Sequence, residues 1–158
     1  MNNLNKNLLE NCGRGDLEIV KYLLSQGAEI ETKNEYGHTA LILASIMGQL
    51  EVVKYLLSQG ADIEARNEYS DTPFISASWR GQLEVVKYLL SQGADIEAKD
   101  KYGHTALMLA SKYGNLEIVK YLIERGIDIE EKDNDGKTFY FFLKECHKKE
   151  ISILIRDI

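Results

Sequence analysis

Apolar residues recur along the chain in short bursts at helical spacing, and the bursts repeat every 33 residues. Residues 48–65 are identical to residues 81–98, and diverged copies of the same run begin at Gly15 and Gly114. Within the run, the leucines and valines of residues 50–57 favour one face of a helix, and charged residues occupy the other. A fixed period of this length predicts stacked supersecondary units rather than one globular core around a single buried pocket.

Each period predicts two short helices, as residues 34–66 illustrate. Thr39 is suited to cap a first helix over residues 40–45, because its hydroxyl can accept a hydrogen bond from a free backbone N–H. Gly48 ends this helix, and a second helix runs until Gly60, which can adopt the left-handed conformation that stops a helix. Neither helix is long enough to be stable alone, so the pairs must stack on one another.

We therefore expect an all-α repeat solenoid that forms a single domain over residues 1–158. Its expected parts are an N-terminal capping repeat, three full repeats and a C-terminal capping repeat, at residues 1–33, 34–66, 67–99, 100–132 and 133–158. The first repeat is rich in asparagine, which fits a face turned to water. The apolar pattern of the last helix is shifted by one residue, which suggests a small insertion near residues 146–147.

Several positions of the period match a known family in phase. The helix starts that match are Gly37-His38-Thr39-Ala40-Leu41, Asp71-Thr72-Pro73-Phe74 and Gly103-His104-Thr105-Ala106-Leu107. With the downstream Gly-x-Leu-Glu-x-Val and Gly-Ala-Asp segments, this pattern resembles the ankyrin repeat over essentially the whole chain. The resemblance implies an elongated L-shaped stack of helix-turn-helix pairs with β-hairpin or turn tips, and a role in protein binding. The chain departs from the family where a histidine and an asparagine are usual, at Ile42, Ile75, Met108, Glu64 and Glu97.

Charge and cysteine content narrow the class of protein further. A net charge of −6 opposes binding to nucleic acid or to an anionic membrane, since both need a basic surface. No run approaches the roughly 18 apolar residues of a spanning helix, and residues 1–6 lack the apolar segment of a signal peptide. Cys12 and Cys146 lie near opposite ends of a linear stack, so we expect free thiols. These features favour an intracellular monomer, in the cytoplasm or the nucleus.

Candidate catalytic residues are few. His38, Asp71 and His104 occupy the same position in successive repeats. Packed helices lie about 8–10 Å apart, so residues in register form a row too wide for metal ligands at about 2 Å or for a hydrogen-bonded triad. The glycines follow the 33-residue period and form no phosphate-binding pattern. We expect no enzymatic activity, no metal and no cofactor.

Candidate binding residues lie at the turns and at the ends of the first helices, where near-identical repeats differ, and they include a turn tyrosine that all three full repeats share. At the turns they are Tyr36, His38, Tyr69, Asp71, Tyr102 and His104, and at the ends of the first helices they are Ile46, Met47, Trp79, Arg80, Lys112 and Tyr113. In ankyrin-type geometry both sets face a concave groove. The three tyrosines either form a row open to a partner or brace their own hairpins. Trp79 is the stronger candidate, because Ile46 and Lys112 at equivalent positions show that the fold needs no aromatic ring there.

The chain is thus predicted to be a non-enzymatic protein-protein interaction module that binds a protein partner through this groove. Charge along the groove is graded, from Glu35 and Glu68 to Arg80, Lys99, Lys101 and Lys112. This gradient would orient a partner of opposite gradient, unless these charges are ordinary solvated ones. One alternative is a structural spacer or a fragment of a longer ankyrin array. Another is a small inhibitor or adaptor similar to ankyrin-only kinase inhibitors, an analogy that rests on size alone.

Overall fold

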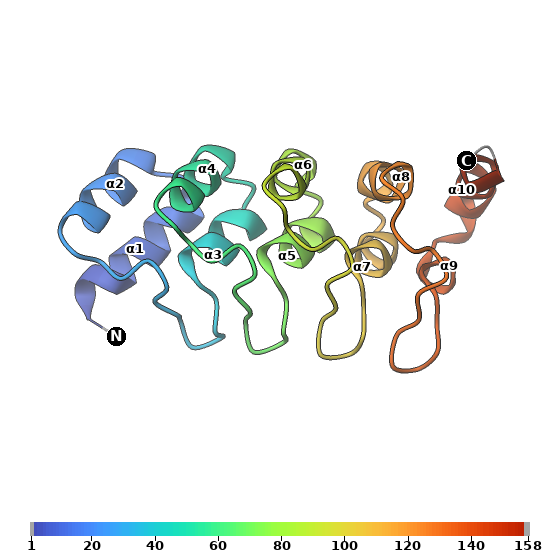
Figure 1. The fold of residues 1–158 in the computed structure, drawn as a ribbon, viewed down its shortest axis with the longest axis horizontal. Coiled ribbons are helices and arrows are strands. Elements are labelled where there is room, and N and C mark those ends of the chain that lie inside the picture. The colour runs from blue at the N-terminus through green and yellow to red at the C-terminus, as the bar shows by residue number, and fades with distance from the viewer. Residues whose placement is uncertain (1, 157–158) are drawn as a thin grey trace.

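Helix pairs stand side by side in one row, and the computed structural model describes this row over residues 2–156, apart from the side chains of residues 145 and 146 (Figure 1). The second helices form an upper layer, the first helices lie beneath them, and the loops between pairs project from the lower side as tips. The helices are α1 (Asn3–Arg14), α2 (Leu17–Ser25), α3 (Ala40–Ile46), α4 (Leu50–Ser58), α5 (Pro73–Arg80), α6 (Leu83–Ser91), α7 (Ala106–Tyr113), α8 (Leu116–Glu124), α9 (Phe139–Phe142) and α10 (Glu145–Arg156). This arrangement confirms the repeat solenoid.

The first helices of the middle pairs begin as the sequence predicts. The hydroxyl oxygens of Thr39, Thr72 and Thr105 accept hydrogen bonds from the backbone N–H three residues on, at 3.3, 3.2 and 3.4 Å. Pro73 stands at the first helical position of α5, where a missing N–H costs no hydrogen bond. The second helices end before a glycine with positive φ, as at Gly60 with a φ of 87°. Local sequence therefore sets the length of each helix.

Packing between the layers produces one continuous core. It runs from Leu8 in α1 to Ile151 in α10, and most of its members are leucine, valine and alanine. A smaller cluster of Ile75, Ala98 and Leu109 lies between α5 and α7, and Trp79 packs against it. Since each pair is covered mainly by its neighbours, no pair could bury its apolar face alone. Within the described residues, no helix is both long and apolar enough to cross a membrane.

A glutamate links each pair to the next along the row. One carboxylate oxygen of Glu31, Glu64 and Glu97 accepts a hydrogen bond from the backbone N–H of the residue 31 positions on, each at 2.8 Å. Within the first pair, the side-chain oxygen of Asn5 accepts a hydrogen bond from the Glu29 N–H at 3.0 Å, and Glu29 is the equivalent of Asp62, whose N–H bonds to Glu31. Asn5 is buried. The asparagines of the first repeat therefore do more than face water, which corrects the simple reading of this segment.

The tips are closed turns more than β-hairpins. In each tip one side-chain oxygen, from Asn34, Asn67, Asp100 or Asp133, accepts from two backbone N–H groups, two and four residues on. Pairing of the strand type is limited, among the described residues, to an isolated bridge between Lys99 and Thr105. These turns fix the tip side chains without a regular sheet.

The last pair differs from the others in its helix boundaries, not in its register. Helix α9 is only four residues long, and α10 begins at Glu145 and runs for 12 residues. Ile151 is fully buried, and it stands 33 residues after Ile118, which is also buried. The 33-residue period is therefore kept, and the predicted insertion near residues 146–147 is wrong. The shifted apolar pattern reflects the polar outer face of a terminal helix.

Candidate protein-binding groove

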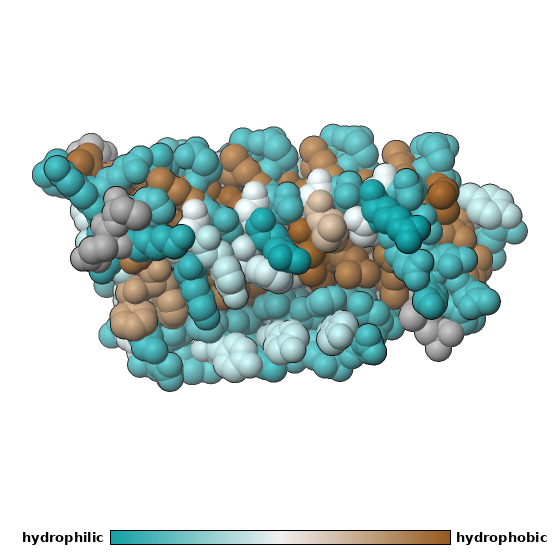
Figure 2. Space-filling model, turned by 180° about the vertical axis from the view of Figure 1, so that it is seen from behind, coloured by the Kyte–Doolittle hydropathy of each residue, from teal (hydrophilic) through white to brown (hydrophobic). Residues whose placement is uncertain are grey.

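A groove runs along the row between the tips and the first helices, and we call it the tip–helix groove. Figure 2 shows the molecule from behind, with hydrophobic surface recessed above the more polar row of tips. Two hollows deepen the groove, and each is lined by tip residues on one side and by residues of two neighbouring first helices on the other. The larger lies between α1 and α3, and the smaller between α5 and α7.

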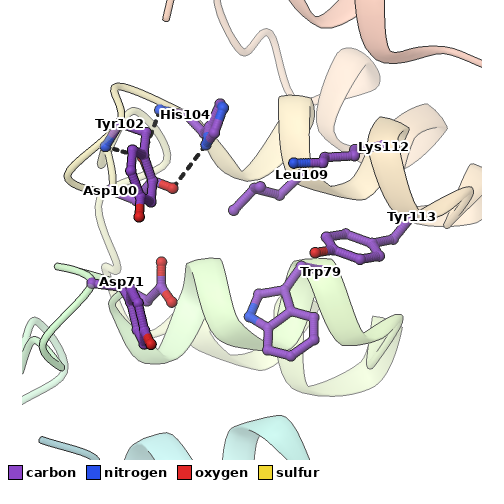
Figure 3. Close-up of a pocket in the computed structure, with 9 residues that line it drawn as sticks. Asp71, Trp79, Asp100, Tyr102, His104, Leu109, Lys112 and Tyr113 are labelled. Atoms are coloured by element: carbon purple, nitrogen blue, oxygen red, sulfur yellow. Dashed lines mark hydrogen bonds and ion pairs between the residues drawn. The ribbon is translucent and has the colours of Figure 1, made fainter. Parts of the chain in front are cut away.

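Trp79 dominates the smaller hollow, which has a volume of about 190 Å³. Its indole faces Tyr113 of the next first helix, with ring centroids 5.5 Å apart (Figure 3). The Arg80 guanidinium lies 4.5 Å from the centre of the Trp79 ring. Trp79 also packs against the cluster that contains Ile75 and Leu109. Trp79 is consequently half-buried, and side-chain freedom already restricted by these contacts lowers the entropy cost of binding through its exposed part.

The tip tyrosines form a row of exposed rings beside this hollow. Tyr36, Tyr69 and Tyr102 are each about half exposed. The Lys101 ammonium lies 4.1 Å from the Tyr69 ring centre and 5.1 Å from that of Tyr102, so it bridges two neighbouring tips. Tyr36 and Tyr102 lie beside the histidine two residues on, with centroids 6.0 and 5.8 Å apart. Tyr36 and Tyr102 thus contact their own tips, Tyr69 contacts the next tip, and all three rings remain about half exposed.

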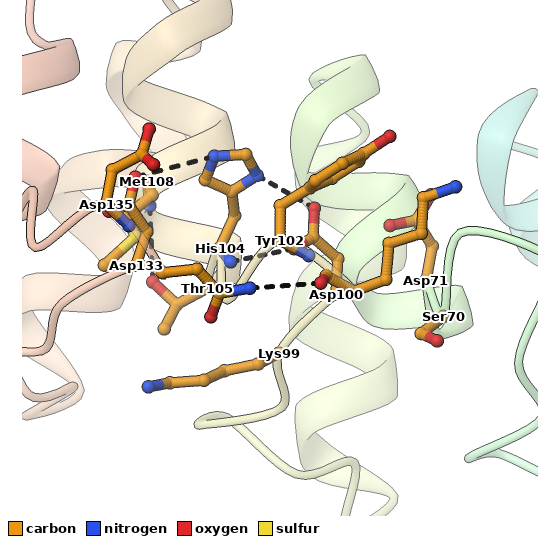
Figure 4. A network of polar contacts seen from close by, with 12 residues as sticks. Ser70, Asp71, Lys99, Asp100, Tyr102, His104, Thr105, Met108, Asp133 and Asp135 are labelled. Carbon is orange, nitrogen blue, oxygen red and sulfur yellow. Dashed lines mark hydrogen bonds and ion pairs between the residues drawn. The ribbon is translucent and has the colours of Figure 1, made fainter.

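A buried polar network supports the tips near Trp79 (Figure 4). His104 Nδ1 lies 2.9 Å from an oxygen of Asp100, and His104 Nε2 lies 3.7 Å from an oxygen of Asp133 in the next tip. Asp71, on the preceding tip, faces the same group. Burial raises the pKa of the Asp71 carboxyl; a hydrogen bond from Asn67 opposes this rise and the charge of Asp100 adds to it. Sequence reasoning missed this network, although the Asp-x-x-x-His spacing was visible.

His38 occupies the same position as His104 but has different neighbours. Asn34 and Asn67 replace the two aspartates, and His38 Nδ1 is buried without a hydrogen-bond partner among the described residues. Burial lowers the pKa of His38, and the charge of Glu68 opposes this only in part. His38 therefore favours the neutral ring, and the two histidines are not chemically equivalent.

The predicted site residues fall into three groups. Seven are exposed in or beside the groove: Tyr36, Met47, Tyr69, Arg80, Tyr102, Lys112 and Tyr113. Four are half-buried: His38, Asp71, Trp79 and His104. Ile46 is only 8% exposed, because it lies within the packed end of α3, so it offers no contact surface and the prediction for this residue is corrected. The Lys99 ammonium contacts Glu131 at 2.5 Å and the Lys132 carbonyl oxygen at 3.2 Å. Because its charge is paired with Glu131, Lys99 does not contribute a free positive charge to the predicted gradient.

The larger hollow was not predicted. Its volume is about 680 Å³, and its apolar walls are Leu9, Leu43 and Met47. Gly13 stands at the position of Ile46, Trp79 and Lys112 in the 33-residue period, so the first pair has no side chain where the others have one. Lys6, Glu10, Arg14, Asn34 and Glu35 form the rim. Aligning the first repeat with the others would have revealed this gap.

Metal-ligating side chains are dispersed in the described residues, and the Cys12 thiol is buried. In the part of the chain that the structure describes, histidine, cysteine, aspartate and glutamate side chains nowhere form a group of three suited to holding a metal ion. Cys12 is buried, and burial raises the pKa of its thiol to about 12, which removes the thiolate that reactivity needs. The features that remain are an apolar and aromatic groove with charged edges.

Comparison with known families agrees with this architecture. A family model described as ankyrin repeats (3 copies) matches residues 8–100 and 66–133. The matches cover more than half of the chain, which belongs to the ankyrin-repeat family. Ankyrin repeats are generally protein-protein interaction modules, and they typically bind protein partners.

Two viral proteins share shorter segments with this chain. Over 34 residues it is 53% identical to the putative ankyrin repeat protein R873 of Acanthamoeba polyphaga mimivirus, a match that covers 22% of this chain and 7% of that protein. Over 43 residues it is 44% identical to the putative ankyrin repeat protein R886 of the same virus, covering 27% of this chain and 33% of that protein. The chain therefore spans a third or less of the length of these curated relatives.

Proposed function

We propose that this protein is a non-enzymatic binding module that holds a protein partner in the tip–helix groove. The observation that carries the proposal is the arrangement at Trp79. Trp79 contacts Tyr113 and Arg80 at a groove position whose residue type differs from pair to pair. By contrast, the second helices of two neighbouring pairs, α4 and α6, have identical sequences. Trp, Tyr and Arg are the types that dominate interface energetics.

Preorganisation further supports a binding role for this cluster. Trp79 rests on Ile75 and Leu109, and the polar network beneath the tips fixes the opposite wall of the hollow. A partner that buries the exposed edge of the indole therefore has little side-chain freedom to remove. Arg80, Lys112 and the exposed tyrosines surround the cluster with polar groups suited to an interface rim.

Partner capture with matched variants tests the proposal. Tyr113→Ala removes an exposed groove ring, and Trp79→Ala removes the half-buried one. The control is Lys87→Ala, which removes a partly exposed charge of α6 that pairs with Glu84. We expect Tyr113→Ala and Lys87→Ala to leave the urea unfolding midpoint nearly unchanged. Both groove variants should lose the partner, since a central aromatic anchor contributes about 2–4 kcal/mol to binding.

The same capture experiment can contradict the proposal. If both groove variants recover the same partner as the parent protein, the partner binds elsewhere. If the parent protein reproducibly captures no partner, the spacer function becomes the better account. Because Tyr113 is exposed, a loss of binding in Tyr113→Ala cannot be ascribed to unfolding once the unfolding midpoint is shown to be intact.

A further inference from the structure

The hollow beside Gly13 and the position of Trp79 are equivalent places in the repeat. Gly13 stands 66 residues before Trp79, which is two periods of the chain. Both positions lie near the end of a first helix and face the same groove. Trp79 therefore shows that this repeat position can accommodate an indole. In the first pair the position is glycine, so the space is not filled by a side chain of that residue.

The walls of the two places also correspond. Trp79 packs on Ile75 and Leu109 and faces Tyr113. Two periods earlier, the residues at these three positions are Leu9, Leu43 and Met47, and all three line the Gly13 hollow. Leu9 is buried and forms the floor, while Met47 is exposed at the opening. The positions that contact the Trp79 indole are therefore apolar in the first pair as well, where they surround the hollow beside Gly13.

An arginine accompanies each place. The Arg80 guanidinium lies 4.5 Å from the centre of the Trp79 ring. Arg14 is its equivalent two periods earlier, and it lies on the rim of the Gly13 hollow. A guanidinium stacks favourably on an aromatic face. The remaining rim charges are of both signs, Lys6 against Glu10 and Glu35, so the rim favours neither a cationic nor an anionic guest.

We infer that the Gly13 hollow is a seat for an aromatic side chain of a partner protein, with tryptophan the best fit. The inference rests on the proposed function, since it names part of what a partner would insert into the tip–helix groove. At about 680 Å³, the hollow has room for the ring and for the backbone that carries it. An apolar residue of the methionine type at the opening adapts readily to different ring shapes.

A small-molecule titration tests the seat without any partner. The probe is N-acetyl-tryptophanamide, and methyl NMR of the whole chain reports on Leu9, Leu43 and Met47. We expect saturable shifts at these methyl groups with a dissociation constant on the order of millimolar, as suits a fragment of this size. N-acetyl-leucinamide should bind about 2- to 10-fold more weakly, because it lacks the aromatic contribution. Arg14→Gln should weaken the tryptophan probe about 2- to 5-fold.

Filling the seat from within gives an independent test. A side chain added at Gly13 would approach Met47 at an ordinary contact distance of 4.0 Å, and Gly13 lies in a helix without positive φ. Gly13→Trp, in a Trp79→Phe background, should show blue-shifted and quencher-protected emission, and should abolish probe binding. Gly13→Ala is the matched control, since it changes helix propensity without filling the hollow, and should still bind the probe.

Several outcomes would overturn the inference. They are an absence of methyl shifts with the tryptophan probe, equal or tighter binding of the leucine probe or of N-acetyl-lysinamide, and unchanged probe binding in folded Gly13→Trp. The titration on the unmodified chain decides the matter if Gly13→Trp fails to fold. If the probe does not bind, partner capture through Trp79 and Tyr113 still tests the proposed function. If no partner is captured, the probe titration still tests the Gly13 hollow.

Discussion

The close contact between neighbouring tips predicts that substitution of Gly37 destabilises the protein. This glycine has a φ of 74°, and a Cβ added to it would lie 2.9 Å from the backbone nitrogen of Glu68 in the next tip. Gly60 has a similar φ of 87°, but an added Cβ there meets nothing within 4 Å. The pair Gly37→Ala and Gly60→Ala therefore separates the cost of the backbone conformation from the cost of disturbing the neighbouring tip.

The magnitude follows from what each alanine disturbs. Both variants place alanine in the left-handed region, which costs about 1–2 kcal/mol. Gly37→Ala must also displace the next tip, which threatens the hydrogen bond from the Glu68 N–H to the Tyr36 carbonyl oxygen at 3.2 Å. Loss of a hydrogen bond together with local overpacking adds about 2–4 kcal/mol. Gly37→Ala should thus be the more destabilising variant by that amount.

Urea unfolding followed by circular dichroism measures the difference. The free energy of unfolding of the two variants and the parent is compared at matched m-values, so that a change in unfolding cooperativity is recognised. If Gly37→Ala and Gly60→Ala agree within about 0.5 kcal/mol, which is the ordinary scatter of surface substitutions, backbone contact between tips does not couple the helix pairs.

Two further predictions concern titratable groups. Since the folded protein holds the Asp71 proton more tightly than the unfolded chain, this group lowers stability as pH rises from about 3.8 through the raised folded pKa. Asp71→Asn should therefore be more stable than the parent in urea unfolding at pH 7, with the gain vanishing at pH 3, and a loss of stability at pH 7 would contradict the assignment. Cys12, with a thiol pKa raised to about 12, should resist iodoacetamide in the folded protein and react in urea, as peptide mass spectrometry can follow; rapid labelling of Cys12 without urea would contradict its burial.

The sequence predicted what local chemistry and the period determine. Thr39 and Gly60 mark helix ends through interactions with residues three or four positions away, and such signals survive in a single sequence. Glu64 was visible only as a departure from the family pattern. Its function, accepting a hydrogen bond from the Asp95 N–H, depends on how two pairs are placed in space. The sequence pattern could not predict the hydrogen bonds between repeats, because these depend on how neighbouring pairs are placed in space.

The groove shows the same division. Positions such as Met47 and Tyr113 were found because they vary between repeats, and both are exposed. Ile46 was included for the same reason, yet it is buried, since variation alone does not report depth. Gly13 was missed because an absent side chain gives no signal until it is aligned with Trp79. Whether these residues bind a partner stays a prediction.

The joints made by Glu31, Glu64 and Glu97 have a consequence for how such a molecule can grow. Each joint uses the same carboxylate, the same 31-residue spacing and the same 2.8 Å bond. A 33-residue block inserted between two pairs brings its own glutamate acceptor and its own backbone N–H donor. The row can therefore lengthen or shorten without changes in the neighbouring pairs. The side chains along the groove take no part in these three glutamate hydrogen bonds, so a groove side chain can change in one pair without altering them.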